Sequence, residues 1–190
     1  MDLVLNGLIA GIMLLLVIRF SRKDGKWTTE IVKQAFCFFT VQSNALCAVS
    51  ALLLCLFPHA GWAWTLKYVG TAAVTVTMLT VLFFLGPVIG YRRLLSGSDL
   101  IMHLINPVLA LVSFCVFERR GLTFGWAMLG LLPVVLYAML YGWKVLLCPP
   151  ERRWEDFYGF NKGGKWYLSF VLMLLGTFLV CLGLMGIQNL

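Results

Sequence analysis

The sequence predicts an all-α protein: a polytopic bundle of six transmembrane helices that encloses an intramembrane polar pocket. Of its 190 residues, 61% are hydrophobic and only 12% are charged, and the mean hydropathy is +0.92. A soluble domain typically carries about 25% charged residues, so a membrane protein is indicated. Six apolar segments have close to or above the ~20 residues that cross ~30 Å of hydrocarbon, and they make residues 1–190 one transmembrane domain.

We expect the spans at residues 3–20, 31–57, 68–91, 100–117, 123–145 and 166–187. The first is interpreted as a helix and not as a cleaved signal peptide, because Met1-Asp2 offers no basic segment ahead of it. Pro87, Pro107 and Pro133 fall inside later spans, where proline interrupts helical hydrogen bonding and can open space for a ligand.

Two connections carry local signals. Residues 58–64, between the second and third spans, are interpreted as a short turn with interfacial tryptophans. Ser96 and Asp99 have the spacing of a capping box, which predicts that the fourth span starts there.

Basic residues predict the orientation. The connections 1–2, 3–4 and 5–6 with their flanks carry twelve lysines and arginines, whereas the opposite side carries three. The positive-inside rule therefore predicts a multi-pass protein of the cell membrane with cytoplasmic odd-numbered connections and both termini outside. The same rule explains the net charge of +7, so we expect the lipid bilayer and no nucleic acid as partner. The twelve are Arg19, Arg22, Lys23, Lys26, Lys33, Arg92, Arg93, Lys144, Arg152, Arg153, Lys162 and Lys165, and the three are Lys67, Arg119 and Arg120.

A polar run interrupts the second span at residues 38–44, Phe-Phe-Thr-Val-Gln-Ser-Asn. At 3.6 residues per turn, Thr40, Ser43 and Asn44 share one helix face. Polar groups are costly in hydrocarbon unless they find partners, so this face is expected to point into the bundle.

The predicted partner is His103 in the fourth span, which shares a face with Asp99 and Asn106. Thr40 follows the last charge, Lys33, by seven residues, about 10 Å of helix, and His103 follows Asp99 by four, about 6 Å. The hydroxyl and the imidazole are therefore expected to meet in the cytoplasmic half of the membrane.

This pair suggests nucleophilic catalysis. A hydroxyl becomes nucleophilic when a neighbouring imidazole takes its proton, so Thr40 is the candidate nucleophile and His103 the candidate base. Asp99 is either the group that orients the ring or only a helix cap, and Ser43 is a rival nucleophile. The supporting or oxyanion candidates are Gln42, Ser43, Asn44, Asp99 and Asn106. The alternative is that these polar groups only hold helices together by hydrogen bonds.

The connection at 148–165 is the longest, and its mixture of Pro, Gly, aromatic and charged residues is typical of a loop that caps a site. The alternative is a solvated loop that lies on the membrane, with tyrosines that serve as interfacial anchors. No Cys or His spacing suggests zinc, and the paired histidines of a haem carrier are missing, so no metal or cofactor is expected. The pocket or lid candidates are Tyr137, Tyr141, Trp154, Asp156, Tyr158 and Asn161.

Three segments resemble the six-span membrane threonine hydrolases of the androgen-induced gene one family, in particular the small bacterial, Pr6Pr-like branch. They are the polar run at 38–44, His103 followed by Pro107, and the aromatic segment 154–160. The resemblance implies that Thr40 and His103 cleave long-chain acyl substrates, namely fatty-acid esters of hydroxy fatty acids. A more distant branch is thought to transfer acyl chains through a cysteine, and Cys37 lies one turn before Thr40.

Two other classes of function stay open at the level of the sequence. The same pocket would serve a non-catalytic protein that binds or transports a lipid or small solute, although no inverted repeat is visible. A purely structural membrane protein would use the polar groups for packing alone.

Overall fold

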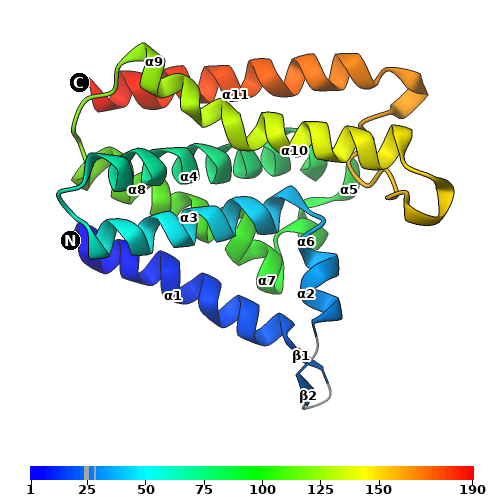
Figure 1. Ribbon diagram of the computed structural model, residues 1–190, viewed down its shortest axis with the longest axis horizontal. Helices are drawn as coiled ribbons and strands as arrows, with labels where there is room; N and C mark the ends of the chain where they lie inside the picture. Colours follow the sequence, from blue (N-terminus) through cyan, green and yellow to red (C-terminus); the bar gives the residue numbers. More distant parts are fainter. Residues whose placement is uncertain (24–25, 28) are drawn as a thin grey trace.

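The structure, a computed structural model, describes residues 1–23, 26–27 and 29–190. It is 82% helical, and six of the helices described are long and apolar enough to cross a membrane. The predicted all-α polytopic bundle is thereby confirmed. Because the number of spans is even, both termini lie at the same end of the bundle, opposite α5 and α6 (Figure 1).

Three of the spans are interrupted helices. The first, second and sixth spans are the continuous helices α1 (Asp2–Phe20), α3 (Phe39–Leu56) and α11 (Trp166–Gln188). The third span is α4 (Gly61–Thr80) with η1 (Val81–Leu85) and α5 (Gly86–Ile89), and the fourth is α7 (Gly97–Leu100) with η2 (Ile101–Ile105), α8 (Asn106–Val112) and η3 (Ser113–Phe117). The fifth span is α9 (Phe124–Ala127) with η4 (Met128–Leu131), α10 (Leu132–Gly142) and η5 (Trp143–Leu147). The connections hold a two-residue hairpin, β1 (Arg22–Lys23) and β2 (Lys26–Trp27), together with α2 (Glu30–Ala35), α6 (Tyr91–Leu94), η6 (Pro150–Arg152) and η7 (Lys162–Gly164).

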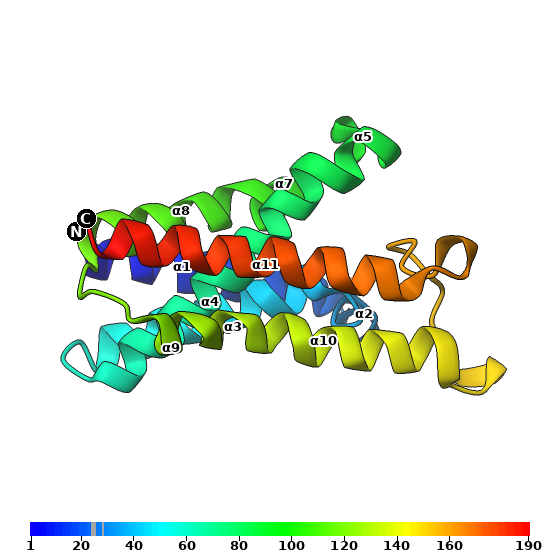
Figure 2. The same cartoon turned by 90° about the horizontal axis from the view of Figure 1, so that it is seen from above.

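Helix α4 lies at the centre and packs against α3, α8, α10 and α11. It is the most buried of the spans, as expected for a helix surrounded by others. Helix α4 can approach α3 closely because Gly70 has no side chain; a Cβ at this position would lie 2.8 Å from the Cα of Cys47. Small residues commonly allow such close helix contacts in membranes. Seen from above, α11 lies beside α10, and α5 turns away from the other helices (Figure 2).

The predicted second span, 31–57, is too long. Residues Glu30–Ala35 form the separate helix α2, and the membrane span starts only at Phe39. A helix over 31–57 would be about 40 Å long at 1.5 Å per residue, more than the ~30 Å of hydrocarbon. Thr40 consequently lies in the first turn of α3, and not 10 Å into a helix that begins near Lys33.

The predicted third span, 68–91, starts too late. Helix α4 begins at Gly61, so the tryptophans of the predicted turn at 58–64 belong to the helix, and the turn itself is confined to residues 57–60. Lys67, counted among the basic residues of the membrane surface, is completely buried inside the bundle. The fourth span starts at Gly97 after Ser96, as the capping spacing predicts, but no side-chain capping hydrogen bond forms.

Each intramembrane proline lies just after a turn that departs from α-helical hydrogen bonding. The π-helical turns η1 and η2 precede Pro87 and Pro107, and the 3-10 turn η4 precedes Pro133. Proline has no N–H to donate and its ring crowds the preceding turn, which accounts for the altered pattern. His103 lies within η2 and is therefore held by one of these turns.

Candidate functional site

The hydroxyl of Thr40 and the imidazole of His103 meet, as predicted. Thr40 Oγ1 lies 3.3 Å from His103 Nε2, although the two residues are 63 positions apart in the chain. His103 is buried and Thr40 partly so. Both belong to the end of the bundle where α5, α6 and α2 lie (Figure 1).

The proton on the ring can be assigned from the other nitrogen. His103 Nδ1 lies 2.7 Å from the carbonyl oxygen of Leu94, at the end of α6. A carbonyl oxygen can only accept, so Nδ1 donates and the neutral ring presents an unprotonated Nε2 to Thr40. Asp99 does not orient the ring as the sequence suggested, because its side chain is exposed and Leu94 occupies the Nδ1 position.

Asn44 and Asn106 fix the distance between the two spans. Asn44 Nδ2 donates to the carbonyl oxygens of Thr40 at 2.8 Å and Met102 at 3.0 Å, and Asn44 Oδ1 accepts from Asn106 Nδ2 at 2.7 Å. Asn44 thus ties the first turn of α3 to η2, which carries His103. Since its amide protons are already used, Asn44 supports the pair and does not supply an oxyanion donor.

The other two predicted oxyanion candidates also have different partners. Ser43 Oγ lies 2.8 Å from Thr77 Oγ1 and 3.1 Å from the Thr40 carbonyl oxygen, so it links α3 to α4. Gln42 Nε2 donates to the carbonyl oxygen of Phe36 at 2.7 Å. The same bonds leave Ser43 without contact to an imidazole, unlike Thr40.

Tyr158, from the connection between α10 and α11, reaches the start of α3. Its hydroxyl accepts a hydrogen bond from the backbone N–H of Phe39 at 3.1 Å. Burial raises the pKa of Tyr158, and interactions with the backbone N–H groups of Phe39 and Thr40 and with the Thr40 hydroxyl act in the opposite direction. The tyrosine therefore keeps its proton at neutral pH beside the candidate nucleophile.

Asp156 folds the loop that carries Tyr158. Its Oδ1 accepts from the hydroxyl of Tyr141 at 3.0 Å and the N–H of Phe160 at 2.7 Å, and its Oδ2 accepts from the N–H of Asn161 at 2.8 Å. Asp156 and Asn161 therefore brace the loop instead of lining the pocket.

Aromatic contacts complete the closure of this end. Tyr141 contacts the rings of Trp154 and Tyr158, with centroids 6.3 Å and 5.3 Å apart. Tyr137 donates to the carbonyl oxygen of Cys37 at 2.8 Å and so anchors α10 to the segment before α3. The predicted cap is thus a packed aromatic cluster, of which Tyr137, Tyr141 and Tyr158 line the cavity.

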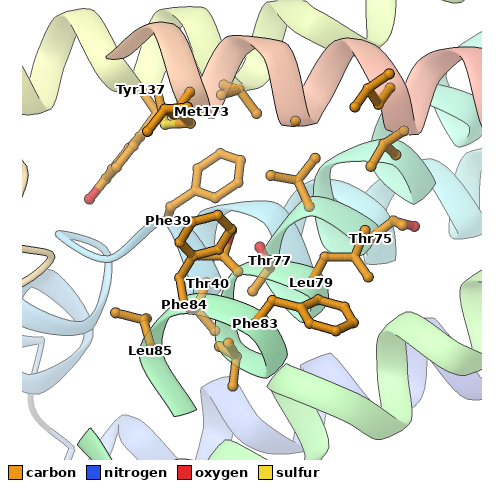
Figure 3. Close-up of a pocket in the computed structure, with 18 of the residues that line it drawn as sticks. Phe39, Thr40, Thr75, Thr77, Leu79, Phe83, Phe84, Leu85, Tyr137 and Met173 are labelled. Carbon is orange, nitrogen blue, oxygen red and sulfur yellow. The ribbon is translucent and has the colours of Figure 1, made fainter. Parts of the chain in front are cut away.

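A cavity of about 740 Å³ extends from Thr40 between α4, η1, α10 and α11. Figure 3 shows Thr40 and Phe39 on one side of it and Met173 of α11 on the other. Most of its wall is apolar, and the positions on α11 run from Ser169 to Ile187, about 27 Å at 1.5 Å per residue. His103 does not line the cavity, and its Nε2 contacts Thr40, which does.

The cavity opens sideways toward the region that lipid occupies. Its wall includes Phe83 and Phe84 of η1 and Leu172 and Leu179 of α11, whose side chains are all at least half exposed. In a membrane such side chains would face hydrocarbon, so this part of the cavity wall would lie against lipid.

Sequence patterns did not identify the Leu94 carbonyl oxygen as the partner of His103, or α11 as a wall of the cavity. A backbone carbonyl has no signature in the sequence, but Gly176 and Gly183, seven positions apart on α11, share the helix face that lines the cavity and leave space there. No three His, Cys, Asp or Glu side chains of the described residues are grouped so that they could hold a metal ion.

The chain matches no family model, no curated protein and no solved structure.

Proposed function

We propose that the protein is an intramembrane lipid-ester hydrolase in which Thr40 is the nucleophile and His103 the general base. The observation that carries this proposal is the contact of Thr40 Oγ1 with His103 Nε2 at 3.3 Å, combined with the bond of Nδ1 to Leu94. Catalytic bases act within about 2.6–3.2 Å, and this contact is commonly longer before substrate is bound. The resemblance to the androgen-induced gene one family agrees with the same two residues.

Acylation would begin when Thr40 Oγ1 attacks the ester carbonyl carbon as its proton passes to His103 Nε2. The carbonyl π electrons move to oxygen, and the hydroxyl of Tyr158, which lies beside the first turn of α3, would donate to that oxyanion. The C–O bond to the alcohol then breaks, and the alcohol oxygen takes the proton from the imidazolium.

Deacylation would use the same groups. Water attacks the acyl-threonine carbon while its proton passes to His103 Nε2. The bond to Thr40 Oγ1 breaks, Thr40 recovers the proton, and a fatty acid leaves. The Leu94 carbonyl holds the Nδ1 proton in both halves, so the imidazolium is stabilised without a buried carboxylate.

The substrate would be a long-chain acyl ester, such as a fatty-acid ester of a hydroxy fatty acid. The apolar cavity, its sideways opening and its length along α11 suit an extended chain. Transfer of a chain from lipid gains far less than the ~0.8 kcal/mol per methylene found for transfer from water. Selectivity would therefore depend on the shape of the cavity more than on hydrophobic burial.

We also propose that this end of the bundle faces the cytoplasm of a cell membrane. The connections at that end are the ones in which the basic residues are concentrated, and the positive-inside rule favours a cytoplasmic location for them. Both termini would then lie outside.

The experiment is active-site labelling. Purified protein in nanodiscs is incubated with a long-chain alkyl fluorophosphonate, and the modified residue is located by mass spectrometry. We expect an adduct on Thr40 that disappears in His103→Ala and in Thr40→Ala. Ser43→Ala and Cys37→Ala are the matched controls, and both should be labelled like the wild type.

A second candidate function is non-catalytic lipid binding or transport, because the same cavity would hold a lipid without cleaving it. In that case long-chain esters bind to the protein but no residue is labelled and no ester is hydrolysed.

In the labelling experiment, an adduct on Ser43 or Cys37 in place of Thr40 would overturn the assignment of the nucleophile.

A further inference from the structure

A second polar cluster lies toward the end of the bundle opposite Thr40. Lys67 is in the second turn of α4 and is fully buried, and Glu118, which follows η3, is 6% exposed. Asn6 of α1 and Thr71 of α4 are buried beside them at 2% and 0% exposure. Both termini lie at this end (Figure 1). The proposed hydrolase mechanism uses none of these residues.

Glu118 is held inside the bundle by three bonds. Its Oε1 accepts from Asn6 Nδ2 at 2.5 Å and from Ser113 Oγ at 2.6 Å, and its carbonyl oxygen accepts from Trp64 Nε1 at 2.7 Å. These bonds join α1, η3 and α4. The carboxylate cannot turn toward the aqueous surface without losing its bonds to Asn6 and Ser113, while the Trp64 bond holds the backbone of Glu118 in place.

Lys67 and Glu118 share one polar region without touching. Lys67 lies one turn after Trp64, whose indole N–H donates to the carbonyl oxygen of Glu118. No ion pair within 4.0 Å joins the ammonium to the carboxylate. Four buried atoms here have no hydrogen-bond partner among the described residues: Lys67 Nζ, Thr71 Oγ1, Asn6 Oδ1 and Glu118 Oε2.

The unsatisfied groups indicate the chemistry of the ligand. Lys67 Nζ is a donor, Asn6 Oδ1 and Glu118 Oε2 are acceptors, and the Thr71 hydroxyl is both. A buried charge or polar group without a partner is strongly destabilising, and buried water commonly satisfies such groups with about three hydrogen bonds. An anion would be repelled by Glu118 and a cation by Lys67, so a small neutral molecule that donates and accepts fits best.

We propose that water binds between Lys67 and Glu118 and bridges them as a buried ion pair. The bridge fastens α1 and α4 to the end of the fourth span. Four fully buried apolar residues, Ile9, Cys47, Val74 and Ala110, pack together between the cluster and the Asn44–Asn106 pair.

The first test is a thermal double-mutant cycle in nanodiscs with Lys67→Met, Glu118→Gln and the double variant. Each single change leaves one buried polar group without its counterpart, so each should lower Tm by several degrees. The double variant should recover at least half of the summed loss. Arg119→Met is the control, because Arg119 is exposed and bonds only to the Cys115 carbonyl oxygen, and its Tm should stay at the wild-type value.

Two further measurements, which need neither Lys67→Met nor Glu118→Gln, keep the proposal testable if those variants do not fold. The infrared difference between wild type and Ser113→Ala should show a shifted ionised carboxylate band, since Ser113 donates to Glu118. A density map that resolves ordered water should show a peak between Nζ of Lys67 and Oε2 of Glu118. Additive losses of Tm, a protonated carboxyl band or an absence of density at that position would overturn the proposal.

Discussion

The carbonyl oxygen of Leu94 lies 2.7 Å from Nδ1 of His103 and so determines which nitrogen of the ring faces Thr40. Leu94 belongs to the short helix α6, nine residues before His103. The orientation of the ring thus depends on how the third span returns to the fourth, and not on a charged partner. A neutral backbone acceptor also avoids the desolvation that a buried carboxylate would undergo.

Replacing Thr40 should separate catalysis from packing. Thr40→Ala removes the attacking oxygen, so hydrolysis of a long-chain ester should fall by a factor on the order of 10⁴. Stability should fall by only about 0.6 kcal/mol, the typical value of an intramembrane hydrogen bond. Thr40→Ser keeps the hydroxyl and should retain substantial turnover. Ester hydrolysis and thermal unfolding in nanodiscs measure the two effects, and equal turnover in all three proteins would exclude Thr40 as nucleophile.

Tyr158→Phe should lower kcat without a comparable change in KM. If the hydroxyl donates to the oxyanion, its removal should cost roughly 10²–10³ in kcat, as for other oxyanion donors. Because burial raises the pKa of Tyr158, the donor keeps its proton and the difference between the two proteins should persist into alkaline solution. Steady-state kinetics at several pH values measure it.

The matched control for that prediction is Tyr68→Phe, since the Tyr68 hydroxyl is also buried and bonds to the Ala127 carbonyl oxygen, away from Thr40. Its removal should change kcat much less. Equal losses in both variants would mean that the tyrosines contribute only packing.

Asp156→Ala should loosen the connection between α10 and α11. The side chain accepts three hydrogen bonds that fold the loop, and an alanine leaves the two N–H groups and the Tyr141 hydroxyl without them. Limited trypsin digestion should then cleave faster at Arg152, Arg153 and Lys162. Glu155→Ala, at the exposed neighbouring position, should be digested at the wild-type rate. Unchanged digestion of Asp156→Ala would contradict the bracing role.

Gly176→Leu should shorten the acyl chain that the cavity accepts. A Cβ at Gly176 meets nothing within 4 Å and the position lines the cavity, so the new side chain should fill the cavity without displacing a neighbour. Gly186→Leu is the control on the same helix, because Gly186 is also open but lies outside the cavity. Native mass spectrometry with fatty acids of increasing length measures the effect without requiring turnover. Identical length preferences would show that the chain binds elsewhere.

Gly70→Ala should destabilise the bundle. The added Cβ would lie 2.6 Å from Ser50 Oγ and 2.8 Å from Cys47 Cα, and a backbone atom cannot move aside without separating α3 from α4. Overpacking of this kind costs about 1–3 kcal/mol. Gly61→Ala, at the open start of the same helix, should leave Tm within a degree or two of the wild type. A Gly70→Ala protein as stable as Gly61→Ala would show that the helices are less tightly packed.

Part of the site could be inferred from local patterns. Thr40, Ser43 and Asn44 share a face because helical periodicity fixes it, and the contact of Thr40 with His103 follows from two inward-facing polar residues at similar depth. The predicted depth of Thr40 was wrong, because no proline or glycine before Phe39 marks the break between α2 and α3. Lys67 was likewise placed at the surface, because a sequence gives the type of residue but not the neighbours that bury it.

The six-span membrane bundle follows from local features of the sequence, since hydropathy, span length and proline position act within a few helical turns. The packing of the spans was needed to show that Leu94 instead of Asp99 orients His103, that Tyr158 reaches α3, and that Lys67 and Glu118 are enclosed at the far end. These relationships join residues of different spans, and they depend on distances of a few ångströms between helices. Local composition fixes where a helix runs, but the packing of helices against one another fixes which polar atoms meet.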